Sequence, residues 1–106
     1  GDDILTIPLM AVGGVGVISV LANAYPTLFK KMTDFALAGE FKRAAAIQRK
    51  FAKLHPMMYE EGNPTGLKVI LNELKLAGNA VRLPMTNASA ELNKKILSEM
   101  SAIKKG

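Results

Sequence analysis

The chain has 106 residues, of which 49% are hydrophobic and 6% aromatic, a length that allows one small domain with a modest core. It has no cysteine and a single histidine, which excludes disulfides, zinc–thiolate sites, a thiol nucleophile and a His-rich metal cluster. We expect neither a cofactor nor a metal ion. The absence of cysteine fits the reducing cytoplasm, which is the predicted location.

The net charge of +5 is unevenly distributed, because all 14 Lys and Arg residues lie from Lys30 onward. A basic helical half can bind nucleic acid. The basic residues alternate with glutamates and lack interleaved aromatic side chains, which favours solvated helix faces instead. No nucleic-acid partner is therefore predicted.

The segment from Ile4 to Phe29 carries no charged residue and is long enough to span a membrane. Pro8 and Pro26 lie near its ends, and glycines interrupt its middle. A better interpretation is helix, glycine turn, strand, turn and helix, so no membrane partner is expected. Asp2 or Asp3 can cap the first helix, which is predicted to run to about Val12.

A short β-branched run, Val17 to Val20, follows the glycines Gly13, Gly14 and Gly16 and is typical of a buried parallel strand. Such a strand needs neighbours on both edges and cover on both faces. No other run in the sequence indicates a strand, and the chain starts at Gly1 rather than Met. We therefore interpret the chain as the C-terminal piece of a larger protein.

The rest of the sequence predicts helices with apolar stripes at three- and four-residue spacing. Pro64 and Ser89 are suited to the starts of the last two, and Gly39 and Gly78-Asn79 to helix ends. Pro56 should kink or end the helix predicted from Glu40 to Met58. The predicted ranges are Pro26–Ala38, Glu40–Met58, Pro64–Leu76 and a last helix that follows Ser89. In that last helix the residues expected to face inward are Leu92, Ile96, Met100 and Ile103.

Several motifs occur in an order and spacing that resemble the C-terminal third of the dihydrodipicolinate synthase family. They are Gly1-Asp2-Asp3, the segment Gly13–Val20, Asn23, Gly62-Asn63-Pro64 with Lys68, and Arg82-Leu83-Pro84-Met85-Thr86. The resemblance runs through nearly the whole chain, and favours this family over related pyruvate aldolases such as N-acetylneuraminate lyase.

The resemblance implies a mainly α chain that is the end of a (β/α)₈ TIM barrel, with its last strand and helix, followed by a C-terminal helical domain. Residues 1–38 are predicted to be the end of the barrel and residues 39–106 a three-helix domain. It also implies a lyase of lysine (diaminopimelate) biosynthesis that condenses pyruvate with aspartate semialdehyde through a Schiff base on a lysine. That lysine and a proton-relaying tyrosine fall on earlier strands, so the fragment itself is expected to be inactive.

The resemblance further implies three substrate-binding residues at the barrel mouth. Ile18 corresponds to a position whose backbone contacts pyruvate, and Gly1 and Asp2 to a loop near the entry of the second substrate. The structural alternatives to these binding roles are that Ile18 is a core residue of the strand and that Asp2 caps the first helix. No catalytic residue is assigned within the chain, and Lys68 and His55 are interpreted as structural or solvated.

The family also implies a homo-oligomer, with a tetrameric parent and a fragment that self-associates. Two other classes stay open: a non-enzymatic helical interaction module, and a small basic membrane-associated protein.

Overall fold

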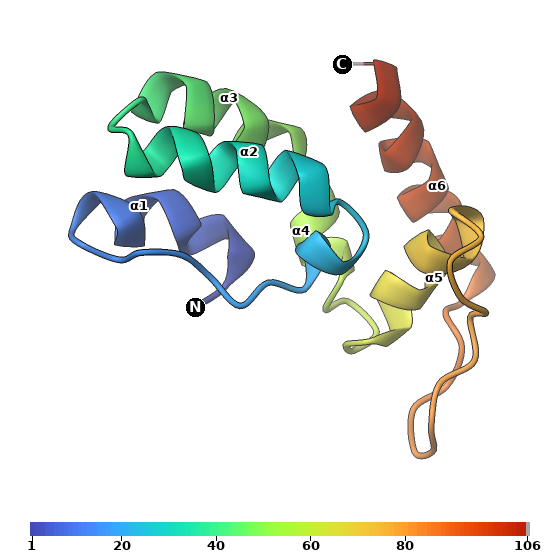
Figure 1. The fold of residues 1–106 in the computed structure, drawn as a ribbon. Helices are drawn as coiled ribbons and strands as arrows, with labels where there is room; N and C mark the ends of the chain where they lie inside the picture. The colour runs from blue at the N-terminus through green and yellow to red at the C-terminus, as the bar shows by residue number, and fades with distance from the viewer. Residues whose placement is uncertain (106) are drawn as a thin grey trace. The chain divides into compact units, whose positions relative to one another are not determined.

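The computed structural model describes residues 1–105 and shows a mainly helical chain, as predicted (Figure 1). It divides into two compact units, Gly1–Ala52 and Lys53–Gly106. The first unit contains η1 (Asp3–Leu5), α1 (Thr6–Ala11), η2 (Leu21–Asn23), α2 (Pro26–Leu37) and α3 (Phe41–Lys50). The second contains α4 (Leu54–Met57), α5 (Thr65–Glu73) and α6 (Ala90–Lys105).

In the first unit, α1 and α3 both pack on α2 (Figure 1). The core consists of apolar side chains that recur along these helices, and an aromatic cluster closes it where α2 begins and α3 ends. The rings of Tyr25 and Phe29 lie 5.4 and 5.0 Å from the ring of Phe51. Gly39 ends α2 as predicted, with φ of +78°, while the Glu40 amide donates to the Phe35 carbonyl at 2.8 Å.

The strand predicted at Val17–Val20 is not formed. Residues 14–19 are irregular, Val20 lies in a bend, and residues 1–105 contain no strand. A strand is defined by the ladder to its neighbour, and the described part of the chain offers no second extended segment to pair with. Within residues 1–105, the β-branched run Val17–Val20 therefore lacks the neighbouring strand that it would need.

The long helix predicted from Glu40 to Met58 is two helices, α3 and α4, separated by a turn at residues 51–53. Pro56 lies inside α4 rather than at its end. Proline has no N–H, and its ring clashes with the carbonyl four residues earlier, which here belongs to Ala52. The interruption therefore falls one turn before the proline.

The helix after Pro64 is shorter than predicted, because α5 ends at Glu73 instead of near Leu76. Lys75 takes the left-handed conformation, with φ of +60°, that a glycine usually supplies. The amide of Leu76 donates to the Leu71 carbonyl at 2.9 Å, which completes the C-terminal cap. Gly78 was therefore wrongly expected to end this helix.

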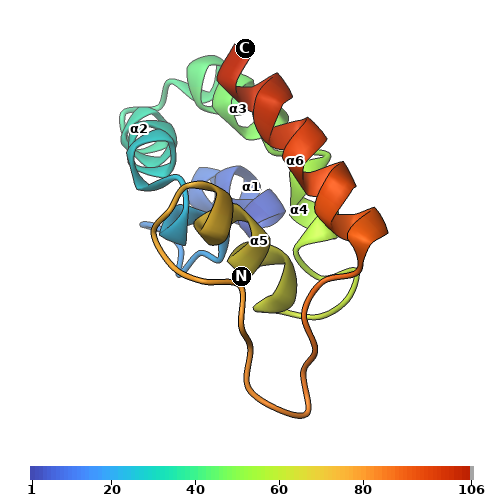
Figure 2. The same ribbon diagram turned by 90° about the vertical axis from the view of Figure 1, so that its right-hand side faces the viewer.

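In the second unit, α6 packs against α5 and α4, and residues 74–89 form the excursion between α5 and α6 (Figure 2). The close approach of α5 to α4 depends on Gly66. A Cβ at this position would lie 2.7 Å from the Met57 carbonyl oxygen. Three of the four residues predicted to face inward from α6 are buried, namely Leu92, Ile96 and Ile103, and Met100 is partly exposed.

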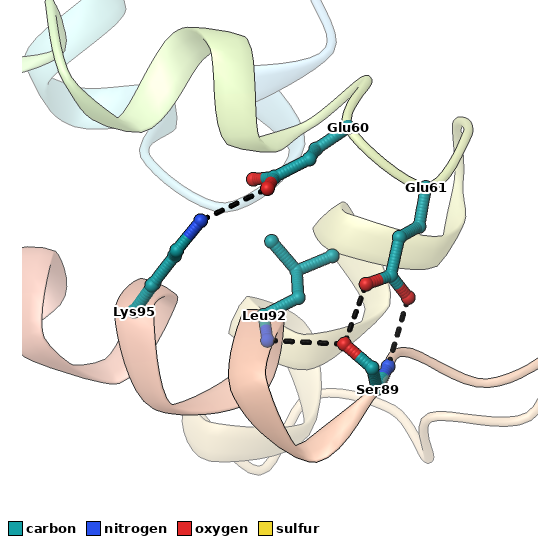
Figure 3. A network of polar contacts seen from close by, with 5 residues as sticks. All are labelled: Glu60, Glu61, Ser89, Leu92 and Lys95. Atoms are coloured by element: carbon teal, nitrogen blue, oxygen red, sulfur yellow. Dashed lines mark hydrogen bonds and ion pairs between the residues drawn. The ribbon is translucent and has the colours of Figure 1, made fainter.

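A polar network fixes the start of α6 (Figure 3). Ser89 Oγ accepts from the Leu92 amide at 3.1 Å, which confirms the predicted cap. Glu61, from a different part of the chain, accepts from the Ser89 amide at 2.8 Å and from its hydroxyl at 2.5 Å. Lys95 pairs with Glu60 at 2.9 Å.

The boundary between the two compact units lies between Ala52 and Lys53. The sequence analysis predicted that the end of the barrel lies at residue 38. The unit boundary follows from contacts within this chain, in which α3 packs on α2. The predicted boundary concerns which helices belong to a barrel, and it stays a prediction.

Candidate functional site

The three residues expected to bind substrate all have exposed side chains or, for Gly1, an exposed backbone. Gly1 and Asp2 precede the first turn, and Asp2 has extended backbone with φ of −64° and ψ of 147°. Its side chain makes no capping hydrogen bond, so the prediction that Asp2 caps the helix is wrong. The main-chain carbonyl of Asp2 accepts from the Leu5 amide at 2.9 Å, which leaves the carboxylate in solvent.

Asp3 does not cap the first helix either, and its side chain turns inward. The residue is only 4% exposed, and Oδ2 accepts a hydrogen bond from the Leu21 amide at 2.9 Å. The other carboxylate oxygen, Oδ1, is buried without a hydrogen-bond partner among the described residues. Asp3 therefore connects the N-terminal turn to a residue 18 positions later.

Two further hydrogen bonds hold this turn in place. The hydroxyl of Thr6, itself buried, donates to the Asp3 carbonyl at 2.8 Å. From α3, the side-chain amide of Gln48 donates to the Ile4 carbonyl at 2.7 Å. The backbone that follows Gly1 and Asp2 is thus fixed from three directions.

The glycines after α1 allow the chain to reverse sharply. Gly13 has φ of +113°, and the Gly14 amide donates to the Leu9 carbonyl at 2.9 Å. A Cβ on Gly14 would lie 2.9 Å from that same carbonyl oxygen, so a larger residue does not fit. The chain then leaves α1 and runs to Ile18 without secondary structure.

Ile18 is 97% exposed, as are the side chains of Val12 and Val15 at 83% each. The alternative that Ile18 is a core residue is therefore not realised within this chain, because its side chain is not buried. Its backbone contact with pyruvate stays a prediction. Three apolar side chains in seven residues make a surface that soluble chains usually cover.

The segment is fixed again just beyond Ile18. Ser19 Oγ accepts from the Ala22 amide at 2.9 Å, and the side-chain amide of Asn23 donates to the Val20 carbonyl at 3.0 Å. These bonds place Asn23 in the turn that precedes α2. Leu21 is fully buried between them.

The geometry therefore joins the two predicted pieces of the site through a residue that the sequence did not assign. Asp2 adjoins Asp3, and Ile18 lies three residues before Leu21, to which Asp3 binds. The sequence did contain a hint of this role, because a helix needs only one capping residue and the pair Asp2-Asp3 offers two. Sequence alone treated the two aspartates as equivalent candidates for the helix cap, while the fold exposes Asp2 and buries Asp3.

Other titratable groups lie outside this site. Lys68 is partly exposed on α5, and His55 lies with its ring 5.3 Å from that of Tyr59. Within residues 1–105 no group of three or more His, Cys, Asp and Glu side chains can hold a metal ion. Over the same residues, no helix has both the length and the apolar character needed to cross a membrane.

An open groove of about 360 Å³ lies between α1 and α3. Its walls are mainly apolar, and Arg49 and Gln48 contribute the polar part. Gly1, Asp2 and Ile18 do not line it, so it is separate from the predicted substrate site.

Comparison with known proteins gives a consistent result. Residues 1–103 match the Dihydrodipicolinate synthetase family. The 4-hydroxy-tetrahydrodipicolinate synthase of Cytophaga hutchinsonii is 45% identical over 96 residues, which are 91% of this chain and 32% of that protein. The chain thus spans about a third of the length of the relatives it matches.

Solved structures agree with the sequence match. The dihydrodipicolinate synthase of Aquifex aeolicus superposes with a TM-score of 0.91 at 36% identity, over 98% of this chain and 36% of that one. The chloride-inhibited enzyme of Acinetobacter baumannii complexed with pyruvate gives 0.92 at 30% identity, over 98% and 36%. On the match to residues 1–103 and these relatives, the chain belongs to the dihydrodipicolinate synthetase family.

Proposed function

We propose that residues 1–106 supply the C-terminal part of a 4-hydroxy-tetrahydrodipicolinate synthase, a cytoplasmic lyase that condenses pyruvate with aspartate semialdehyde in lysine biosynthesis. The observation that carries this proposal is the open segment around Ile18. It has no regular secondary structure, exposes apolar side chains and is fixed at both ends, and it lies within the part of the chain that matches the family. In a barrel, the backbone of Ile18 would face pyruvate, and Gly1 and Asp2 would line the entry of aspartate semialdehyde.

In this proposal the chain positions substrate and does not supply the nucleophile. A lysine that forms a Schiff base must lose its proton, which a desolvated pocket favours. Every described lysine side chain is exposed or partly exposed, on helices or the turns beside them. The isolated chain should therefore be inactive, and the Schiff-base lysine and proton-relaying tyrosine belong to the preceding strands.

A chimera tests the proposal directly. Residues 1–106 would replace the matching third of the Cytophaga hutchinsonii enzyme, to which the chain is 45% identical over 96 residues. We expect the chimera to form the product and to give a borohydride-trapped pyruvate adduct visible by intact mass. The isolated chain, treated in the same way, should give no adduct. An inactive but folded chimera, or an adduct on the isolated chain, would contradict the proposal.

We also propose that the isolated chain self-associates through the segment between Ile4 and Val20, and that a parent synthase is a homo-oligomer. The exposed side chains of Val12, Val15 and Ile18 support this, because uncovered apolar surface recruits other chains. Light scattering should give a mass above that of the monomer. The triple variant V12S/V15S/I18S should shift it toward the monomer, and equal masses would count against this interface.

A further inference from the structure

The connection between α5 and α6, residues 74–89, is long and contains no helix or strand. Its middle part, residues 76–84, projects away from the two helices that it joins, and we call this part the arm (Figure 2). Connections of more than about 12–15 residues without regular structure are uncommon, and they are usually either functional or disordered. The arm therefore calls for an explanation.

Both ends of the arm are fixed to the second unit. At its start, the Leu76 amide donates to a carbonyl of α5 at 2.9 Å. Just beyond its end, the buried hydroxyl of Thr65 donates to the Thr86 carbonyl at 3.1 Å. Met85 lies against Gly62, where a Cβ would come within 2.5 Å of Met85 Cε. The arm is thus held at its base and is not a free linker.

The arm exposes large apolar side chains. Leu76 is 65% exposed and Leu83 is 89% exposed, and Arg82 is the only charged residue between them. A single exposed leucine is ordinary on a protein surface. Two of them in one short segment that is fixed at its base indicate a surface that another group covers.

Part of a motif that carried the family resemblance lies in the arm and has no role in the packing of the second unit. Arg82-Leu83-Pro84-Met85-Thr86 falls within residues 1–103, which match the family. The last two residues of the motif make the contacts that fix the base of the arm. Arg82 and Leu83 are exposed instead. The first half of the motif is therefore free to contact something outside this unit.

The occupant that fits the arm best is the preceding part of a synthase chain. The 106 residues match 32% of the Cytophaga hutchinsonii enzyme, so about two thirds of such an enzyme lie outside them. A second copy fits less well, because stable complexes bury about 800 Å² and about 20–30 residues on each partner, many more than the arm contains. A contact within one chain needs less surface, because its two parts are already joined and do not lose the entropy of association.

On these grounds, and resting on the function proposed above, we propose that the arm is a docking element of the synthase. It packs Leu76 and Leu83 against an apolar surface of the part that precedes residue 1. The contacts of Thr86 and Met85 hold the arm in the position from which it docks. Side chains that are exposed in the isolated chain are therefore covered in the whole enzyme.

Thiol labelling tests whether the arm is covered. The chain has no cysteine, so Leu83→Cys introduces a unique thiol. In the isolated chain it should react freely with a maleimide, because this position is 89% exposed. In the chimera with the Cytophaga hutchinsonii enzyme, labelling of the peptide that carries residue 83 should be at least about tenfold slower. Ser101→Cys, at an exposed position of α6, is the control and should react equally fast in both proteins.

A second pair of variants tests whether the docked leucine stabilises the enzyme. Leu83→Asp should leave the melting temperature of the isolated chain unchanged and lower that of the chimera by about 5 °C, because it places a charge in an apolar contact. Asn79→Asp adds the same charge to the same arm at an exposed polar residue, and it should change neither temperature. Equal effects of the two variants in the chimera would show that charge alone matters and that Leu83 does not dock.

The remaining outcomes separate this inference from the proposed function. If residue 83 reacts as fast in an active chimera as in the isolated chain, or if Ser101→Cys is protected equally, the inference is wrong and the proposed function stands. If labelling of Leu83→Cys in the isolated chain slows about tenfold as the protein is concentrated, a second copy covers the arm and the inference is also wrong. An inactive wild-type chimera overturns the proposed function, and the docking role with it.

Discussion

Two glycine-containing segments of this chain have opposite surroundings. Around Gly66, in the second unit, α5 lies so close to α4 that a Cβ would meet the backbone of Met57 and Met58 at 2.7 and 3.0 Å. Around Gly16, in the first unit, a Cβ would meet nothing within 4 Å. The helices around Gly66 are closely packed, while the segment that carries Ile18 leaves its apolar side chains uncovered.

The two units also differ in their hydrogen bonding, and the difference indicates which part of the chain is suited to bind a substrate or another chain. In the second unit, Glu61 reaches across from a distant turn to satisfy both the amide and the hydroxyl of Ser89. In the first unit, the segment of residues 14–19 is fixed only at its ends. A closely packed pair of helices suits a support, and an open segment suits a binding surface.

The largest test of this contrast compares two isoleucines. Ile96 is fully buried and Ile18 is 97% exposed. Ile96→Ala should lower the free energy of unfolding by about 3 kcal/mol, because it removes buried apolar surface and leaves a cavity. Ile18→Ala should change it by less than about 0.5 kcal/mol, as for other surface substitutions. Urea denaturation of both variants measures the difference.

The same pair sharpens the proposed role of Ile18. In the chimera with a complete barrel, Ile18→Ala should become destabilising by about 2 kcal/mol and raise KM for pyruvate, since the side chain would then be covered. Unchanged stability and unchanged KM would show that Ile18 neither packs nor shapes the site.

A second test uses the two glycines. Gly66→Ala should lower the free energy of unfolding by about 2 kcal/mol, because the clash with the Met57 carbonyl outweighs the gain in helix propensity of about 1 kcal/mol. Gly16→Ala is the control, since its Cβ would point into open space. Denaturation midpoints that agree for the two variants would mean that α5 can shift away from α4 at little cost.

How far the sequence predicted this fold depended on the range of the interactions involved. Local signals worked well: Pro26 opens α2, Gly39 ends it, and Ser89 caps α6. The stripe that contains Ile96 also correctly predicted burial. These outcomes depend on residues within a few positions of one another.

The wrong predictions involved contacts between distant parts of the chain, or residues in conformations that are unusual for their type. The strand at Val17–Val20 required a neighbour that residues 1–105 do not contain. Lys75 follows α5 in the left-handed conformation, which glycine usually adopts at a helix end. Asp3 was assigned to a cap, because its real partner lies 18 residues away. For the site, the family resemblance supplied Gly1, Asp2 and Ile18, whose roles stay predictions.

A smaller effect is expected at the start of α6. Ser89→Ala removes the oxygen that accepts from the Leu92 amide and should lower the free energy of unfolding by about 1 kcal/mol. Ser101→Ala is a matched control within the same helix, because that hydroxyl only donates to the Leu97 carbonyl one turn earlier. The two serines should differ clearly in thermal denaturation, and equal melting temperatures would argue against a stabilising cap.

The smallest effect is the pH dependence of the same network. The hydrogen bonds from the Ser89 hydroxyl and amide, with a lesser contribution from Lys95, hold the pKa of Glu61 below its usual value (Figure 3). A carboxyl whose pKa is lower in the folded state binds protons more readily when unfolded. Its contribution to stability is therefore present above about pH 4.5 and is lost as the pH falls through the folded value. Glu61→Gln should flatten the stability profile below that pH. Parallel profiles for wild type and Glu61→Gln would show that the start of α6 does not depend on the charge of Glu61.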